Sequence, residues 1–304
     1  MDINGHADRL AADSTCAPPP AKARLLRKNF ELPPIPAVAV NLLGLLAKDQ
    51  VALSEVAATI SADATIAIEV LRAANTAYYG VRGEVTSIHH ATTLLGVGRI
   101  RALAATIGLR RYLGQALRLP AVLRCWRHNL ACAATSEQIA LRLGGNAADA
   151  YAAGLLHDIG RLALIVAHPK QYPALLDAAD ARGLELLALE RELLGIDHCE
   201  AGLWFTQQLL LPQMFQDVAM HHHNPEAVGH TEMLARVGVA CRLAEWMGFW
   251  VTAPSEQEMK DPPAIDTLVL PLPLAQRVTL VSEAADLVSD VDEQVRSTQS
   301  LFQG

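Results

Sequence analysis

Apolar residues along most of this chain recur every three or four positions, the spacing that places side chains on one face of an α-helix. Two early segments show the pattern clearly, with apolar positions at Val38, Leu42, Leu45 and Leu46, and then at Ile66, Val70, Leu71 and Ala74. No segment alternates apolar and polar residues for long enough to indicate a β-strand. The pattern therefore predicts an all-α fold built from many helices.

Capping residues, prolines and glycines divide this pattern into separate helices. Ser87 is placed to cap one helix, Pro120 begins a long one, and Gly144 follows the end of that long helix. The predicted helices start at residue 37 and continue at 54–60, 64–76, 88–95, 99–113, 120–143, 147–157, 159–167, 173–182, 184–194, 198–210, 212–221, 231–247 and 273–300. The last helix is expected to turn one apolar face inward, formed by Leu274, Val278, Val281, Ala285 and Val288.

Changes in composition divide the chain into four regions. Residues 1–23 are small, polar and proline-rich, which predicts a disordered tail. Residues 24–117 and 118–250 are expected to form two helical halves, and residues 251–304 a loop followed by a C-terminal helix. The loop is placed at 252–267, where prolines and glutamates interrupt the helical pattern.

Composition and charge exclude several classes of protein. The 304 residues are 51% apolar and 5% aromatic, which suits helix packing in a globular protein. The net charge of −7 disfavours a broad surface for nucleic acids or anionic membranes. No apolar run approaches the roughly 20 residues of a membrane span, and the first ten residues lack a signal-peptide layout. The five cysteines, an odd number without a Cys-x-x-Cys pair, indicate reduced thiols. We therefore expect a soluble cytoplasmic protein with no nucleic-acid or membrane partner.

The strongest chemical signal is the placement of the histidines. Imidazole and carboxylate groups on separate helices suit a divalent transition metal such as iron, manganese or zinc. Such an ion would acidify a bound water and hold a phosphoryl oxygen. The candidate metal ligands are His128, His157, Asp158, His198, His222 and His223. Each residue alone is more often an ordinary core or surface group, so the prediction depends on the order and context of the whole set.

A second candidate site lies on the predicted long helix. Cys125, His128 and Cys132 share one face of it at spacings of three and four. This arrangement suits a soft-metal or redox site, although buried thiols more often act as small apolar groups.

These motifs together resemble the HDOD family (HD-related output domain) over about residues 25–250. In the first half the matching segments are Leu32-Pro-Pro-Ile-Pro36, Ile60-Ser-Ala-Asp63, Val70-Leu-Arg-Ala-Ala-Asn75, Tyr79-Gly80, Ser87-Ile-His-His-Ala91 and Leu94-Leu-Gly96. In the second half they are Trp126-Arg-His128, Gly154-Leu-Leu-His-Asp-Ile-Gly160, Asp197-His198 with Gly202, Leu211-Pro212 and His222-His-Asn-Pro225. The resemblance implies a multi-helix, HD-domain-like bundle with two helical subdomains. It also implies a role in bacterial signalling, where HDOD proteins mostly serve as output or scaffolding modules.

The chain departs from the related HD enzymes at positions that matter for catalysis. Those enzymes complete their metal site with a later aspartate, and the matching position here is Cys241, or Arg242 if the alignment shifts by one. Glu245 lies one turn further and would have to move in to replace the aspartate. HD-GYP phosphodiesterases also use a Gly-Tyr-Pro element that is missing here, and Arg124 stands where they have a glutamate. Hydrolysis of cyclic dinucleotides is therefore not expected.

The leading hypothesis is a non-catalytic regulatory module that binds a signalling protein or a small ligand, with its oligomeric state left open. The alternative is a metal-dependent phosphohydrolase of the HD superfamily that acts on a nucleotide or phosphoester. A third hypothesis is DNA binding, because residues 53–75 resemble a helix-turn-helix. Its second helix carries Glu69 and only Arg72 as a basic residue, so no nucleic-acid contact is expected.

Overall fold

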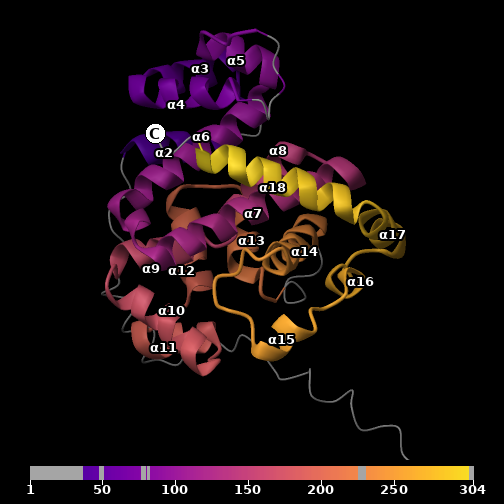
Figure 1. The fold of residues 1–304 in the computed structure, drawn as a ribbon. Helices are drawn as coiled ribbons and strands as arrows, with labels where there is room; N and C mark the ends of the chain where they lie inside the picture. Colours follow the sequence, from indigo (N-terminus) through magenta and orange to yellow (C-terminus); the bar gives the residue numbers. More distant parts are fainter. Residues whose placement is uncertain (1–36, 48–50, 77–79, 81–82, 225–230, 301–304) are drawn as a thin grey trace, which may run out of the picture. The chain divides into compact units, whose positions relative to one another are not determined.

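Every secondary-structure element in the described part of the chain is a helix, which confirms the predicted all-α fold. The computed structural model describes residues 37–47, 51–76, 80, 83–224 and 231–300. The predicted tail (1–23) and the proline-rich segment 32–36 lie outside these residues. The elements in chain order (Figure 1) are α2 (Ala37–Gly44), η2 (Leu45–Ala47), α3 (Leu53–Ser61), α4 (Ala64–Ala74), α5 (Ile88–Leu95), α6 (Val97–Leu113), η4 (Gly114–Arg118), α7 (Pro120–Leu143), α8 (Ala147–Leu156), α9 (Ile159–Ala167), α10 (Gln171–Arg182), α11 (Leu186–Leu194), α12 (His198–Gln208), α13 (Gln213–His221), α14 (Glu232–Trp246), α15 (Glu256–Lys260), α16 (Ile265–Leu268), α17 (Leu274–Ser282) and α18 (Ala284–Ser300).

Helices α2 to α6 enclose an apolar core of their own. Its buried residues include Leu42, Val56, Ile60, Ile66, Val70, Ile100 and Ile107. The side chain of Asn75 joins the end of α4 to the segment before α5, since it exchanges two hydrogen bonds with the backbone of Val85 (2.8 and 2.9 Å). Ser87 caps α5 as predicted, accepting a hydrogen bond from the amide of His90 (3.1 Å). Polar contacts therefore fix the turns, and apolar packing holds the helices.

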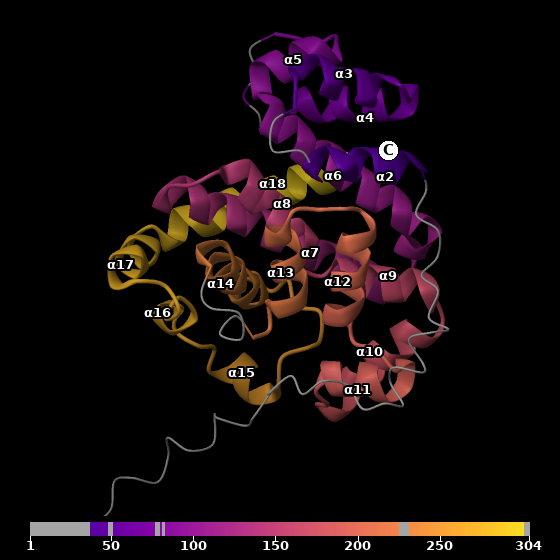
Figure 2. The same cartoon turned by 180° about the vertical axis from the view of Figure 1, so that it is seen from behind.

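The long helix α7 organises the second half of the structure. It begins at Pro120 and ends at Leu143, as predicted. It packs against α8, α14 and α18, and it shares a second apolar core with α14 and α18 (Figures 1 and 2). Helix α9 lies beside α12 (Figure 2). These two contacts, α7 with α8 and α9 with α12, position the histidines.

One segment of the described chain is long and apolar enough to cross a membrane, which the prediction from apolar runs missed. It spans the 21 residues Ala147–Ala167, or α8 and α9 together. The polar residues Asp149, His157 and Asp158 interrupt its apolar sequence. Of the 18-residue stretch within it that is apolar enough, 89% is buried inside the protein, as in the core helices of a globular fold.

Two predictions about the last fifty residues were wrong. The predicted loop at 252–267 contains the short helices α15 and α16, and α15 is preceded by a capping box between Ser255 and Glu258. The predicted helix 273–300 is two helices, with Glu283 between them. Leu274, Val278, Val281 and Ala285 are exposed and Val288 is half-buried, so the buried face is rotated by one residue, or roughly 100°, from the predicted one. The residues that turn inward are Leu280, Leu287, Val291 and Val295.

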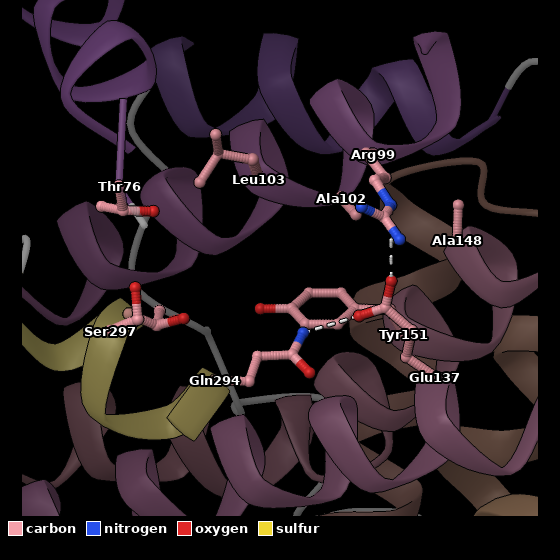
Figure 3. Close-up of a pocket in the computed structure, with 10 residues that line it drawn as sticks. Thr76, Arg99, Ala102, Leu103, Glu137, Ala148, Tyr151, Gln294 and Ser297 are labelled. Carbon is pink, nitrogen blue, oxygen red and sulfur yellow. Dashed lines mark hydrogen bonds and ion pairs between the residues drawn. The ribbon is translucent and has the colours of Figure 1, made fainter. Parts of the chain in front are cut away.

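Helix α18 is fixed to α7 by a buried polar contact (Figure 3). The amide of Gln294 donates a hydrogen bond of 2.6 Å to the Glu137 carboxylate, and Arg99 of α6 lies 3.9 Å from the other carboxylate oxygen. Glu137 and Gln294 are both buried. Burial raises the pKa of Glu137, against the opposing effects of Gln294 and Arg99.

Replacing Gln294 with alanine is expected to lower the free energy of unfolding by about 1–3 kcal/mol, because the buried Glu137 carboxylate loses a donor. The matched control is Glu293→Ala, since Glu293 is the exposed neighbour on the same helix. Chemical denaturation followed by circular dichroism measures both. Equal losses in the two variants would contradict a stabilising role for this contact.

Candidate metal centre

The six predicted ligand residues come together from five helices. They are His128 in α7, His157 at the end of α8, Asp158 just before α9, His198 at the start of α12, and His222 and His223 after α13. The neighbouring imidazole rings have centroids 4.3–5.5 Å apart. All of these residues are buried except His223. The structure thus groups the whole predicted set, and the role of its members as ligands stays a prediction.

Two motif glycines allow this grouping by letting helices approach closely. A β-carbon on Gly154 of α8 would lie 2.5 Å from the carbonyl oxygen of Cys132 in α7. A β-carbon on Gly160 of α9 would lie 1.9 Å from the carbonyl oxygen of His198 in α12. Both distances are too short for any side chain. Glycine at these positions therefore brings α8 onto α7 and α9 onto α12.

A buried ion pair holds the only carboxylate of the predicted set. Asp158 accepts hydrogen bonds from Nε (2.6 Å) and Nη2 (3.3 Å) of Arg161, and Nη2 also lies 3.1 Å from Nε2 of His198. Burial by itself raises the pKa of Asp158, but Arg161 and the nearby histidines hold it well below its usual range. Arg161 was not among the predicted site residues, although it is the one charged residue in the otherwise apolar helix α9. We call Asp158, His198, His222 and His223 the histidine–aspartate cluster.

A second buried carboxylate, Glu190 of α11, orients His198 and was also missed. It accepts hydrogen bonds from Nδ1 (2.7 Å) and the backbone amide (2.9 Å) of His198, and from the hydroxyl of Tyr172. Burial raises the pKa of Glu190, but the charge and hydrogen bond of His198 outweigh this and lower it. Because Nδ1 of His198 is engaged, its Nε2 faces Arg161 and Asp158. No local sequence pattern marks Glu190.

The other side of the centre is lined by two histidines and two cysteines. Nε2 of His128 lies 3.3 Å from Nε2 of His157 and 3.6 Å from Sγ of both Cys132 and Cys241. The ligand atoms of all four residues lie within 4.8 Å of one another. We call this set the cysteine–histidine cluster. Cys132 was predicted to lie beside His128, but its thiol partner here is Cys241 rather than Cys125.

The orientation of α14 shows which of its residues, Cys241 or Arg242, stands at the position of the missing aspartate. Cys241 faces the histidines, whereas Nε of Arg242 donates a hydrogen bond to the carbonyl of Leu268 (3.0 Å). The side chain of Glu245 is exposed and belongs to none of the groups of metal-ligand geometry in the described chain. Arg124, which stands at the glutamate position of the HD-GYP enzymes, pairs with Asp180 of α10 (2.9 Å). In the described part of the chain, no α14 carboxylate therefore joins a group of metal-ligand geometry, although the charge of Glu245 acts to raise the pKa of His128.

The cysteine–histidine cluster favours a thiolate at Cys241. Hydrogen bonds from Cys132 and His128, together with the charge of His128, hold the pKa of Cys241 well below its usual value despite burial. The Cys241 charge in turn raises the pKa of His128 to about 9, although burial by itself would lower it. Burial raises the pKa of Cys132 well above its usual value.

The two clusters differ in how well they fit a metal ion. The resemblance to HD enzymes implies a hydrolytic ion held by imidazole and carboxylate ligands. In the histidine–aspartate cluster, Asp158 and His198 already bind the Arg161 guanidinium, which would repel a second cation. Among the described residues, no arginine or lysine hydrogen-bonds to the cysteine–histidine cluster, which offers nitrogen and sulfur atoms, the typical zinc ligands. The residues present therefore fit a metal site with sulfur ligands and no open position better than a hydrolytic site that keeps a position for water.

The fold and these motifs define an all-helical domain with a His-Asp pair between α8 and α9. The sequence profile of the HDOD domain family matches residues 32–225, so the chain belongs to the HDOD family. This result confirms the resemblance inferred from the sequence.

Known structures support the same fold. An HDOD domain protein of unknown function from Geobacter sulfurreducens has a TM-score of 0.72 and 23% sequence identity, covering 93% of this chain and 99% of its own. A protein from Shewanella amazonensis SB2B, provisionally named a phosphohydrolase, has a TM-score of 0.69 and 23% identity, covering 91% and 97%. A protein from Marinobacter aquaeolei VT8, provisionally named a signal transduction protein, has a TM-score of 0.64 and 19% identity, covering 92% and 66%. At these identities the similarity establishes the fold alone.

One curated relative matches over part of its length. A protein of Treponema pallidum (strain Nichols), described as uncharacterized, is 24% identical over 200 residues, or 65% of this chain. The match covers 39% of that relative, so this chain spans about two fifths of the protein it resembles.

Replacing Arg161 with alanine is expected to lower the free energy of unfolding by about 3–5 kcal/mol, because Asp158 would remain buried without its partner. The matched control is Arg296→Ala, which breaks an exposed ion pair with Asp292 on α18 and should cost about 0.3–0.5 kcal/mol. Urea denaturation measures both losses. A loss at Arg161 as small as the control would mean that the ion pair does not hold this region together.

Proposed function

We propose that this chain is a non-catalytic regulatory HDOD module of bacterial signal transduction, which acts by binding a partner protein or a small ligand. The observation that supports it is the binding of Asp158 by Arg161 inside the protein. Asp158 belongs to the His-Asp pair on which a hydrolytic HD site depends. The oxygens of Asp158 are held by a guanidinium, and no carboxylate of α14 belongs to a metal-ligand group of the described residues, so the acidic ligands that would hold a water-activating metal are lacking there.

The alternative is a metal-dependent phosphohydrolase that acts on a nucleotide or phosphoester. It is favoured by the presence of all five predicted histidines and by the provisional names of two Shewanella amazonensis neighbours. The regulatory hypothesis is preferred because the histidines alone do not provide the missing carboxylates.

A phosphate-release assay separates these two functions. The purified chain, supplied in turn with Mn²⁺, Fe²⁺ and Zn²⁺, is incubated with nucleotides and phosphomonoesters. We expect no more phosphate than from His157→Ala under the same conditions, because Asp158 is held by Arg161. Metal-dependent release by the wild type that disappears in both His157→Ala and Asp158→Ala would overturn the proposal.

A surface pocket of about 730 Å³ offers a place for the small ligand. Its volume lies in the range of small-molecule sites. Four of its lining residues are arginines, in a chain whose net charge is −7, and they come from α6, η4 and α7: Arg110, Arg111, Arg118 and Arg127. Glu69 also lines the pocket and pairs with Arg111 (3.0 Å). Leu123 and Trp126 add apolar surface. This combination suits a phosphorylated ligand with an apolar or aromatic part.

Calorimetric titration with ATP, GTP and pyrophosphate tests this pocket. Arg118→Glu should weaken binding by at least about tenfold, because it replaces a charge-assisted contact with repulsion. The matched control is Arg182→Glu, an exposed arginine at the end of α10 that does not line the pocket. Equal affinities of the two variants, or the absence of binding by the wild type, would exclude this pocket as the site for these ligands.

A further inference from the structure

We propose that His128, Cys132, His157 and Cys241 form a closed tetrahedral zinc site. The four residues come from α7, the end of α8, and α14, and their ligand atoms lie within 4.8 Å of one another. This site includes only two of the six residues of the predicted HD-type set. Two of its four ligands are thiols, and none is a carboxylate. The inference does not depend on the proposed regulatory role.

The distances between these atoms match the edges of a zinc tetrahedron. With Zn–N bonds of about 2.0–2.1 Å and Zn–S bonds of about 2.3 Å, tetrahedral angles place two nitrogens about 3.3 Å apart and a nitrogen about 3.6 Å from a sulfur. The nitrogens of His128 and His157 are 3.3 Å apart. The nitrogen of His128 is 3.6 Å from each of the sulfurs of Cys132 and Cys241. Three edges therefore agree with zinc geometry.

Both imidazoles are oriented for metal binding by backbone carbonyls. Nδ1 of His128 donates to the carbonyl of Phe249 (2.6 Å), and Nδ1 of His157 donates to the carbonyl of Gly154 (2.7 Å). Each Nε2 therefore points into the cluster as the atom that binds the ion. Hydrogen bonds of this kind to the second ring nitrogen are the usual support of zinc-bound histidines.

Charge balance also favours zinc at this position. Two cysteine thiolates neutralise one Zn²⁺, and Asp158 and Arg161 neutralise each other in the adjacent cluster. The buried centre would then carry no net charge. Since all four coordination positions are filled by protein atoms, the site would be structural rather than hydrolytic.

The test measures the metal bound by the full chain, purified under reducing conditions. Elemental analysis should find about one zinc ion per chain. Substitution with Co²⁺ should give the sulfur-to-cobalt charge-transfer absorption and the intense visible bands of a tetrahedral thiolate site. Cys132→Ser and Cys241→Ser should each weaken zinc binding by at least about 100-fold, since even residues that only support zinc ligands contribute 10–100-fold.

Two variants serve as controls, with folding of each checked by circular dichroism. Cys125→Ser should retain zinc, because Cys125 is a buried cysteine of the same helix that lies outside the cluster. His222→Ala should also retain it, because His222 belongs to the histidine–aspartate cluster. If a cysteine variant fails to fold, the Co²⁺ spectrum of the wild type shows whether thiolates bind the metal.

Three results would overturn the proposal. The first is zinc that is lost in His222→Ala and kept in Cys132→Ser and Cys241→Ser. The second is bound Co²⁺ without thiolate charge transfer. The third is a folded wild type that takes up no zinc, whether its thiols are free or Cys132 and Cys241 form a disulfide.

Discussion

The arrangement of this protein's centre depends on pairing the buried charge of Asp158. An isolated carboxylate in this environment would be costly or would become protonated, and the guanidinium of Arg161 prevents both. The pair fixes the start of α9, and the same guanidinium reaches His198 at the start of α12. The histidine–aspartate cluster on one side and the cysteine–histidine cluster on the other are thus arranged around a charge that is already satisfied.

Glycine makes that arrangement sterically feasible. Gly160 leaves room for the backbone of His198, and Gly154 leaves room for the backbone of Cys132. Gly160 therefore allows the close packing beside the histidine–aspartate cluster, and Gly154 allows it beside the cysteine–histidine cluster. The glycines that flank the His-Asp motif are in this way as important to the site as the motif itself, because any β-carbon would push the ligand-bearing helices apart.

The all-α fold and most helix boundaries could be predicted from the sequence, because apolar residues in segments such as α7 and α9 recur at the spacing of an α-helix. The five histidines that come together could also be predicted, because their order along the chain and their neighbouring residues form an uncommon pattern. The sequence could not identify Arg161 or Glu190, whose importance arises only when α9, α11 and α12 pack together. It placed Cys241 at the position of the missing aspartate but left Arg242 open, because one residue is a rotation of about 100° on a helix and only packing sets that rotation. The inward face of α17 was misassigned for the same reason, since the buried residue there is Leu280 and its predicted neighbour Val281 is exposed.

The hydrogen bond from His128 to the carbonyl of Phe249 joins the centre to a segment 121 residues away in the sequence. Phe249 is followed by Trp250, which is 36% exposed, and the amide of Ala253 is held by Asp180 of α10 (2.7 Å). Any binding event that displaces this segment must either break the bond or rotate the imidazole of His128. This one hydrogen bond is thus the contact by which the segment beside the partly exposed Trp250 meets the buried nitrogen and sulfur atoms.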